Sequence, residues 1–146
     1  MRTGSTTIAD ASGIENAFDK KVLIIDDVKL ICRVVSKQLQ SAGFHRNQYL
    51  TDPLRAIEKI NEFQPDLILL DIYMPAMSGL ELLKQIRSKP EYNSIIVLML
   101  SGAGQNDQSQ SLELGASGFL QKPLTPETLA QTITSKFSIA QRPAIQ

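Results

Sequence analysis

Short apolar runs that end in a polar side chain recur along this sequence, and they constrain its fold more than any other feature. The clearest run is Leu67-Ile68-Leu69-Leu70, which ends in Asp71 and lies between Pro65 and the pair Pro75 and Gly79. A run of this length between residues that interrupt regular structure is typical of a strand buried on both faces. The pattern predicts Asp71 at the carboxyl end of a central strand, where open α/β sheets place ligands.

Strand and helix patterns alternate five times along the chain. Strands are predicted around residues 22–25, 49–50, 67–71, 94–100 and 118–121, and helices over residues 28–42, 52–63, 79–88, 104–114 and 125–137. Helical crossovers between successive strands require a parallel sheet with helices on both faces. The sequence therefore predicts an α/β fold.

Capping residues mark the ends of these helices. Asp52 stands before a proline, and Ser78 has capping-box spacing to Glu81, so each is expected to begin a helix. Gly43 and Gly115 are expected to end helices.

The segment 28–42 is predicted to be amphipathic. Its buried face is expected to consist of the apolar residues Leu30, Ile31, Val34, Val35 and Leu39. The opposite face is expected to consist of Lys29, Arg33 and Lys37.

The chain is long enough for one folded domain, which we expect over residues 20–138. Residues 1–19 are rich in Thr, Ser, Ala and Gly, so a flexible leader is expected there, although one helical turn near residues 14–18 is an alternative. Residues 139–146 are expected to form a C-terminal tail.

The charge balance and the short apolar runs exclude several classes of partner. Fifteen basic and fifteen acidic residues cancel, so no overall charge favours nucleic acid or an anionic membrane. No apolar run approaches the roughly 18 residues that a membrane helix needs. The single cysteine, Cys32, rules out an internal disulfide and suits a reducing compartment. We expect a cytoplasmic protein that binds neither a membrane nor, directly, nucleic acid.

Five polar residues stand where the predicted strands end, and these are the candidate site. They are Asp26, Asp27, Asp71, Ser101 and Lys122. Because the carboxyl ends of parallel strands lie on one rim of a sheet, these side chains are expected to converge there although they are distant in sequence.

The chemistry of this set points to a metal ion and a phosphoryl group. Three neighbouring carboxylates repel unless a cation lies between them, and Mg²⁺ suits one or two carboxylates together with phosphate oxygens and water. The Lys122 ammonium and the Ser101 hydroxyl can bind phosphate oxygens, and the backbone amides of Gly102 and Tyr73 can add further donors. Our hypothesis is that Asp71 is a nucleophile that accepts the phosphoryl group.

The motifs around these residues resemble the receiver domain of two-component response regulators, over residues 21–137. Asp26-Asp27 match the acidic metal-binding pair of that family, and Asp71 matches its phospho-acceptor within a close copy of the D-x-x-M-P-x-M-x-G stretch. Ser101 matches its Ser/Thr position, and residues 114–123 match the segment around its lysine, here Lys122. The resemblance implies a flavodoxin-like, doubly wound (βα)5 three-layer sandwich with strand order 2-1-3-4-5 and a cis bond before Pro123.

The resemblance also implies a function. Asp71 would take a phosphoryl group from a histidine kinase or histidine phosphotransfer protein with Mg²⁺, which Asp26, Asp27, Asp71 and the backbone carbonyl of Tyr73 would bind. The acyl phosphate would then hydrolyse, so we expect a regulatory domain that reacts only on itself rather than an enzyme.

Ser101 and Phe119 are the switch residues that the resemblance implies. Their movement would change a face formed by the predicted helix 104–114, the strand 118–121 and the last helix, and so control a downstream protein. Many members of the family have a tyrosine at the Phe119 position, and phenylalanine lacks its hydroxyl. A plain core phenylalanine on the strand is the alternative interpretation of Phe119.

Three further expectations concern dynamics and assembly. The Tyr73 ring borders the path of the hydrolytic water in the family and is expected to slow hydrolysis. The helix 104–114 is poor in apolar residues and is expected to be the most mobile part of the unphosphorylated domain. The alternating ion pairs of dimerising receivers are not evident, so a monomer is expected.

Three alternative interpretations remain, two with a different function and one with the same function in a longer protein. A phosphohydrolase of the haloacid dehalogenase type needs a second Asp two residues after the nucleophile, where this chain has Tyr73. A flavin-binding module needs a Ser/Thr/Gly-rich phosphate loop after the first strand, where this chain has Asp26-Asp27. The chain is also compatible with a receiver fragment of a longer regulator with a transcriptional or enzymatic output.

Overall fold

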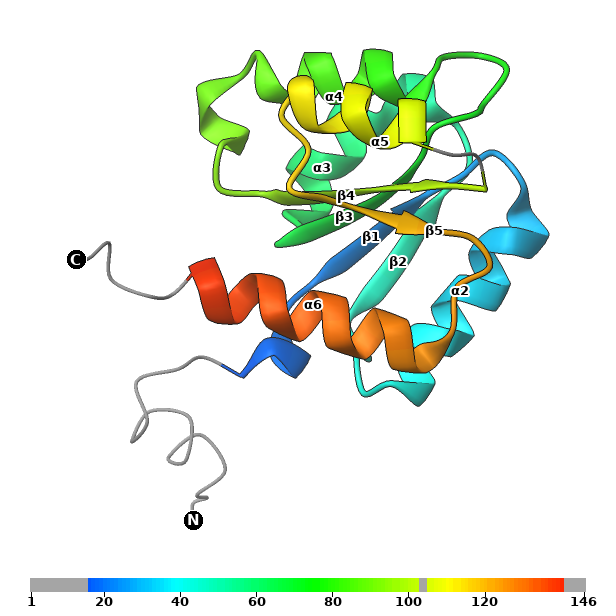
Figure 1. The fold of residues 1–146 in the computed structure, drawn as a ribbon, viewed down its shortest axis with the longest axis vertical. Helices are drawn as coiled ribbons and strands as arrows, with labels where there is room; N and C mark the ends of the chain where they lie inside the picture. Colours follow the sequence, from blue (N-terminus) through cyan, green and yellow to red (C-terminus); the bar gives the residue numbers. More distant parts are fainter. Residues whose placement is uncertain (1–15, 103–104, 141–146) are drawn as a thin grey trace.

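The computed structural model describes residues 16–102 and 105–140 and is built around a parallel sheet of five strands. The strands lie in the order β2-β1-β3-β4-β5, which confirms the predicted flavodoxin-like order (Figure 1). Neighbouring strands are paired in parallel throughout, with Val22 opposite both Asn47 and Leu67. The strand bounds are β1 Val22–Ile25, β2 Asn47–Leu50, β3 Leu67–Asp71, β4 Ile96–Ser101 and β5 Gly118–Gln121.

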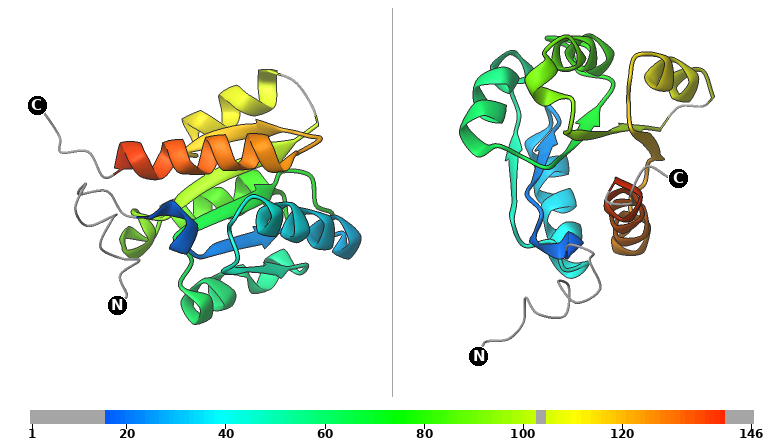
Figure 2. Two further views of the ribbon diagram at one scale, coloured as in Figure 1. Left: turned by 90° about the horizontal axis from the view of Figure 1, so that it is seen from below. Right: turned by 90° about the vertical axis from the view of Figure 1, so that its left-hand side faces the viewer.

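Helices cover both faces of this sheet and complete the three-layer sandwich. The helices α3, α4 and α5 lie on one face, and α2 and α6 lie on the other (Figures 1 and 2). Their bounds are α2 Lys29–Ser41, α3 Ala56–Phe63, α4 Gly79–Arg87, α5 Gln105–Glu113 and α6 Pro126–Ala140. Short 3₁₀ helices occupy Ala17–Asp19 (η1), Pro53–Arg55 (η2) and Pro90–Tyr92 (η3).

Alternate residues of the central strands fill two separate cores. In β1, Val22 and Ile24 pack against α2 and α6, whereas Leu23 and Ile25 pack against α3 and α4. The four residues of β1 and the five residues of β3 are all buried, as predicted for strands covered on both sides. The buried apolar part of each central strand ends where polar residues begin, and these ends form one rim of the sheet.

The predicted helix ends are found, with one difference in helix type. The Asp52 side chain accepts a hydrogen bond from the Leu54 amide, and the Ser78 side chain accepts one from the Leu80 amide. The turn that Asp52 caps is the 3₁₀ helix η2 rather than the first turn of α3. Gly43 and Gly115 have φ angles of 105° and 102°, a backbone conformation that glycine adopts without strain.

The predicted buried face of α2 is wrong in its first half. The buried residues are Cys32, Val35 and Leu39, whereas Leu30 is 67% exposed and Val34 is 47% exposed. The buried residues recur at i, i+3 and i+7, and they pack with strands β1 and β3 and with α6. Apolar periodicity alone could not show which of two overlapping rows of apolar residues on α2 is buried. In the structure the row with Leu30 and Val34 remains exposed as an apolar surface.

Part of the expected leader belongs to the folded unit. Residues 17–19 form η1, which the Asn16 side chain caps, and Phe18 packs against Phe44 with ring centroids 4.9 Å apart. The remainder of the leader, residues 1–15, and most of the tail, residues 141–146, lie outside the described residues. No helix in the described part of the chain is long and apolar enough to cross a membrane.

Candidate functional site

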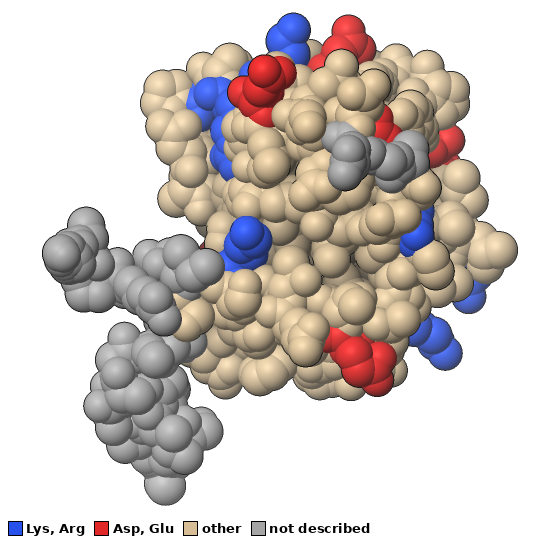
Figure 3. All heavy atoms as spheres, in the orientation of Figure 1, with Lys and Arg blue, Asp and Glu red and all other residues tan. Residues whose placement is uncertain are grey.

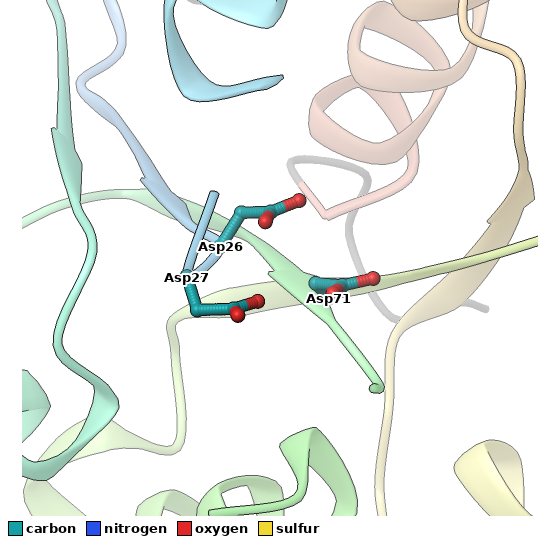
Figure 4. Close-up of side chains that lie close together, drawn as sticks. All are labelled: Asp26, Asp27 and Asp71. Atoms are coloured by element: carbon teal, nitrogen blue, oxygen red, sulfur yellow. The ribbon is translucent and has the colours of Figure 1, made fainter. Parts of the chain in front are cut away.

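Three carboxylates meet at the carboxyl rim of the sheet. Asp26 and Asp27 follow β1, and Asp71 is the last residue of β3. One oxygen from each of the three lies within 4.8 Å of the other two, and the three carboxyl groups point to the same side (Figure 4). Asp26 and Asp71 are buried and Asp27 is partly exposed. The structure thus brings together the acidic residues that the strand ends predicted.

Lys122 supplies the cation of the site. Its Nζ atom lies 2.9 Å from Oδ1 of Asp71 and 3.5 Å from Oδ2 of Asp26. Burial acts to lower the pKa of Lys122, but the hydrogen bond and the negative charge of Asp71 outweigh it and raise the pKa above its ordinary value. The peptide bond between Lys122 and Pro123 is cis, as the resemblance implied.

The Lys122 ammonium alone does not balance the three carboxylates in the described part of the chain. Burial raises the pKa of Asp71 above its ordinary value, the bond from Lys122 opposes this, and the charges of Asp26 and Asp27 add to it. The buried Oδ2 atom of Asp26 has no hydrogen-bond partner among the described residues. Clustered carboxylate oxygens, one of them buried without a hydrogen bond and only 3.5 Å from the Lys122 Nζ atom, are suited to a hard divalent cation.

The loop after Asp71 is held in place by buried side chains and by a backbone hydrogen bond. Ile72 and Met74 are buried among residues of α3 and α4, whereas Tyr73 between them is 62% exposed. The Gly79 amide donates to the Ile72 carbonyl at 2.7 Å, and a Cβ on Gly79 would stand 2.1 Å from the Asp71 carbonyl oxygen. Only glycine can stand at the start of α4, because the backbone there lies directly against the end of β3.

Ser101 lies at the end of β4 and donates its hydroxyl to a residue that was not predicted. The acceptor is Asp107 Oδ2 on α5, at 2.7 Å, and Tyr73 donates its hydroxyl to the same carboxylate at 2.7 Å and 2.9 Å. The bond to Asp107 raises the pKa of the Tyr73 hydroxyl above its ordinary value. In the sequence Asp107 is only one of the polar residues of the predicted helix 104–114. Asp107 and Ser111 lie four residues apart on one face of α5 and are both buried, and no pattern in the sequence shows that this polar face turns inward.

The remaining predicted residues lie around this centre. Phe119 on β5 is partly buried and packs against the core beneath α3 and α4. Gly102 is exposed, and a Cβ there would meet no atom within 4 Å. Neither residue contributes a side-chain polar atom to the site.

The family models identify the chain with one domain family. The model described as "Response regulator receiver domain" matches residues 22–134. Chemotaxis protein CheY-3 of Vibrio cholerae is 32% identical over 118 residues, which cover 80% of this chain and 91% of the relative. A protein-glutamate methylesterase/protein-glutamine glutaminase of Caulobacter vibrioides is 36% identical over 104 residues, which are 70% of this chain and 30% of the relative.

Solved structures agree with the fold. Chemotaxis protein CheY4 of Vibrio cholerae has a TM-score of 0.74 at 34% identity and is matched over 80% of this chain and 98% of that one. A putative response regulator from Chloroflexus aurantiacus has a TM-score of 0.76 at 25% identity, over 82% of this chain and 98% of that one. Both matches span nearly all of the known chain.

Proposed function

Because the chain belongs to the response regulator receiver domain family, it is a phosphorylation-dependent signalling switch, and we propose that Asp71 accepts the phosphoryl group. One observation carries this assignment: Asp71 belongs to the carboxylate cluster and also bonds the Lys122 ammonium at 2.9 Å. A carboxylate beside a candidate metal site and a fixed cation is placed to attack phosphorus while positive charge offsets the phosphoryl oxygens.

In the proposed reaction an Oδ atom of Asp71 attacks the phosphorus of a phosphohistidine on a histidine kinase or histidine phosphotransfer protein. The Oδ–P bond forms as the P–N bond breaks, and the electron pair stays on the imidazole nitrogen, which takes a proton from solvent. In the second half of the cycle water attacks the phosphorus, the P–Oδ bond breaks, and both protons of the water remain with the inorganic phosphate. Inorganic phosphate then leaves and the carboxylate of Asp71 is restored.

We propose that Asp26, Asp27 and Asp71 hold Mg²⁺ together with the backbone carbonyl of Tyr73. The close approach of the three carboxylates supports this, as does the buried Oδ2 atom of Asp26, which has no hydrogen-bond partner among the described residues. When bound, the ion supplies positive charge opposite the phosphoryl oxygens.

The same rim supplies donors for the phosphoryl oxygens in this proposal. They are the Lys122 ammonium, the Ser101 hydroxyl and the backbone amides of Tyr73 and Gly102. Lys122 is already oriented by its bond to Asp71, so little side-chain entropy is lost when the phosphoryl group arrives.

We propose that the phosphodonor protein docks on the exposed apolar surface of α2. Val28, Leu30, Ile31 and Val34 on this surface are all exposed. Ile31 and Val34 also line a groove whose other wall includes Lys122 and Pro123, so the apolar surface runs into the candidate site. An apolar helix face beside a reactive group suits a helical partner that presents its phosphohistidine there.

A variant pair tests this docking surface. Val34→Asp is expected to slow transfer from a histidine phosphotransfer protein that is active toward the wild type, while phosphorylation by acetyl phosphate stays unchanged. Leu112→Asp on α5 is the matched control, because Leu112 is 49% exposed and lies on the other side of the sheet. Equal transfer to both variants would place the donor elsewhere.

The output of the switch is proposed to be the face formed by α5, β5 and α6. Ser101 would turn toward the phosphoryl group, and the partly buried Phe119 ring would move by packing alone, because it lacks a hydroxyl. Charged side chains on the side of the molecule with α5 and α6 are scattered over a largely uncharged surface (Figure 3). We propose that the unphosphorylated chain is a monomer and that this face binds a downstream protein after phosphorylation.

A second context for the same function is a receiver unit within a longer regulator. The match to the Caulobacter vibrioides relative over 30% of its length supports this context, and the match to CheY-3 over 91% of its length supports a stand-alone switch. The chemistry at Asp71 is the same in both.

Acetyl phosphate tests the central proposal. With Mg²⁺ the wild type is expected to gain the mass of one phosphate, and Asp71→Asn is expected to gain none. Asp66→Asn is the matched control, because Asp66 stands before the other end of the same strand, where it accepts a bond from the Lys21 amide. If Asp71→Asn gains the phosphate as readily as the wild type, Asp71 is not the acceptor.

A further inference from the structure

Asp107 joins two hydroxyl groups that come from different sides of the candidate site. Its carboxylate accepts from the Ser101 hydroxyl at 2.7 Å and from the Tyr73 hydroxyl at 2.7 Å and 2.9 Å. Asp107 is 6% exposed and Ser101 is 1% exposed, so the bond between them is shielded from water. A buried carboxylate needs such donors, because without them its charge is costly.

The Ser101 hydroxyl has one proton and therefore donates to one acceptor at a time. If Asp71 accepts a phosphoryl group, as proposed above, the phosphoryl oxygens become a second acceptor near the same rim. We propose that Asp107 is a positioning residue that withholds the Ser101 hydroxyl from the phosphoryl group, and that Tyr73 is the second donor that satisfies Asp107 when Ser101 turns away.

The position of Tyr73 lets it influence whether the Ser101 hydroxyl donates to Asp107 or to the phosphoryl group. Tyr73 follows Asp71 by two residues, and its neighbours Ile72 and Met74 are buried and hold the loop in place. Its hydroxyl lies within hydrogen-bond distance of both Asp107 oxygens, so it can keep a bond to the carboxylate after Ser101 leaves. Removing the Tyr73 hydroxyl therefore leaves Asp107 more dependent on the Ser101 hydroxyl, and removing the Asp107 carboxylate takes away the acceptor that competes with the phosphoryl group.

The same contacts explain how the site reaches α5. The Ser111 hydroxyl bonds the Asp107 backbone carbonyl at 2.7 Å, so the carboxylate is anchored within its own helix. Release of Ser101 from Asp107 removes a tie between β4 and α5, which belongs to the proposed output face. Phosphorylation and the position of α5 are thus linked through one hydrogen bond.

Substitutions with opposite expected signs test this inference. The readout is the dissociation constant for beryllofluoride, a phosphoryl mimic, measured with excess Mg²⁺ by isothermal titration calorimetry. Asp107→Ala is expected to bind about fivefold more tightly than the wild type, since about one hydrogen bond no longer competes. Tyr73→Phe is expected to bind about threefold more weakly. Asp107→Asn keeps a neutral acceptor and is expected to fall between the wild type and Asp107→Ala.

A double-variant cycle separates positioning from a general structural effect. In a Ser101→Ala background the Asp107 substitutions are expected to have no further effect, because the hydroxyl through which Asp107 acts is absent. An effect of equal size in that background would overturn the inference, as would shifts of the same sign for Asp107→Ala and Tyr73→Phe. If Asp107→Ala does not fold, Asp107→Asn with and without Ser101→Ala decides the question in the same way.

The proposed function is judged separately by intact mass. A wild type that gains no phosphate at Asp71 removes the basis of both proposals. A wild type that gains phosphate, with beryllofluoride affinities unchanged by the Asp107 substitutions, leaves the proposed function standing and rejects the role of Asp107 alone.

Discussion

The Nζ atom of Lys122 lies 2.9 Å from Oδ1 of Asp71, so the cation proposed to bind the phosphoryl group is already held by the proposed acceptor. The Lys122 side chain is 31% exposed and the Asp71 side chain 7% exposed, which makes this a partly buried ion pair. Such a pair both orients the ammonium and limits the charge of the carboxylate cluster.

Removal of this ammonium should destabilise the metal-free domain. For Lys122→Ala we expect the free energy of unfolding to fall by about 1–3 kcal/mol, between the values for exposed and fully buried pairs. Added Mg²⁺ should restore part of the loss, because a second cation then offsets the carboxylates. Urea denaturation with and without Mg²⁺ measures both effects. Lys84→Ala, an exposed site on α4, should change stability by less than about 0.5 kcal/mol.

Stability and metal binding should depend on pH in opposite ways. The pKa of Asp71 is raised in the folded state above its ordinary value of 3.8, so folding disfavours the ionised form. Its contribution is therefore most favourable below pH 3.8, declines as the pH rises toward the raised pKa, and is constant above that pKa. Mg²⁺ needs the ionised form, so its affinity should rise over this window and then level off.

Calorimetric titration of Mg²⁺ across the acid range measures that affinity. Asp71→Asn lacks the titrating carboxyl group and should bind Mg²⁺ weakly with a flatter pH profile. An affinity for the wild type that is already constant at pH 3.8 and above would contradict the raised pKa.

Gly79 should tolerate no side chain. A Cβ there would stand 2.1 Å from the Asp71 carbonyl oxygen, which is backbone and cannot move aside without shifting the strand end. We expect Gly79→Ala to lower the free energy of unfolding by at least about 2 kcal/mol and to impair Mg²⁺ binding. Gly102→Ala is the control for stability, since a Cβ there meets nothing within 4 Å. Equal melting temperatures for the two variants would refute the constraint.

The Tyr73 ring and its hydroxyl should have separable effects on the lifetime of the acyl phosphate. If the ring shields the bond from water, Tyr73→Ala should shorten the lifetime, by about threefold or about 0.6 kcal/mol in the barrier. Tyr73→Phe keeps the ring and should retain most of the wild-type lifetime. Loss of phosphate followed by intact mass gives both values, and equal lifetimes for the wild type and Tyr73→Ala would exclude shielding.

Helix α5 should exchange its amide protons faster than β3. Its described inward face includes the polar residues Asp107 and Ser111, whereas the residues of β3 are all buried and mostly aliphatic. Few buried apolar contacts mean a small free energy of local opening. Hydrogen exchange of the unphosphorylated chain checks this, and protection of residues 105–113 equal to that of β3 would count against it.

The fold and the centre of the site could be predicted because both depend on where buried strands end. Apolar runs have to stop where the sheet stops, so Asp26, Asp71 and Lys122 were placed on one rim without any knowledge of their contacts. Their position on one rim is what allows the Lys122 ammonium to reach the Asp71 carboxylate.

Side-chain contacts between helices and loops could not be predicted in the same way. Leu30 and Val34 fit an amphipathic stripe as well as Cys32 does, and only the placement of α2 over the sheet decides which stripe is buried. Asp107 was not predicted to belong to the site, because its partners, Ser101 and Tyr73, belong to other elements. Their bonds depend on how α5 packs, which no local pattern in the sequence reports.

The carboxyl rim joins positions that the chain keeps far apart, since Asp71 and Lys122 are separated by 51 positions. Neither residue has its partner until β5 has been added beside β4 at the edge of the sheet. A copy in which β5 has not joined the sheet therefore lacks the bond between Lys122 and Asp71, whatever the secondary structure of its other elements. Under the proposed function, a phosphoryl group on Asp71 of such a copy would lack the Lys122 ammonium, so the signalling site depends on completion of the whole sheet.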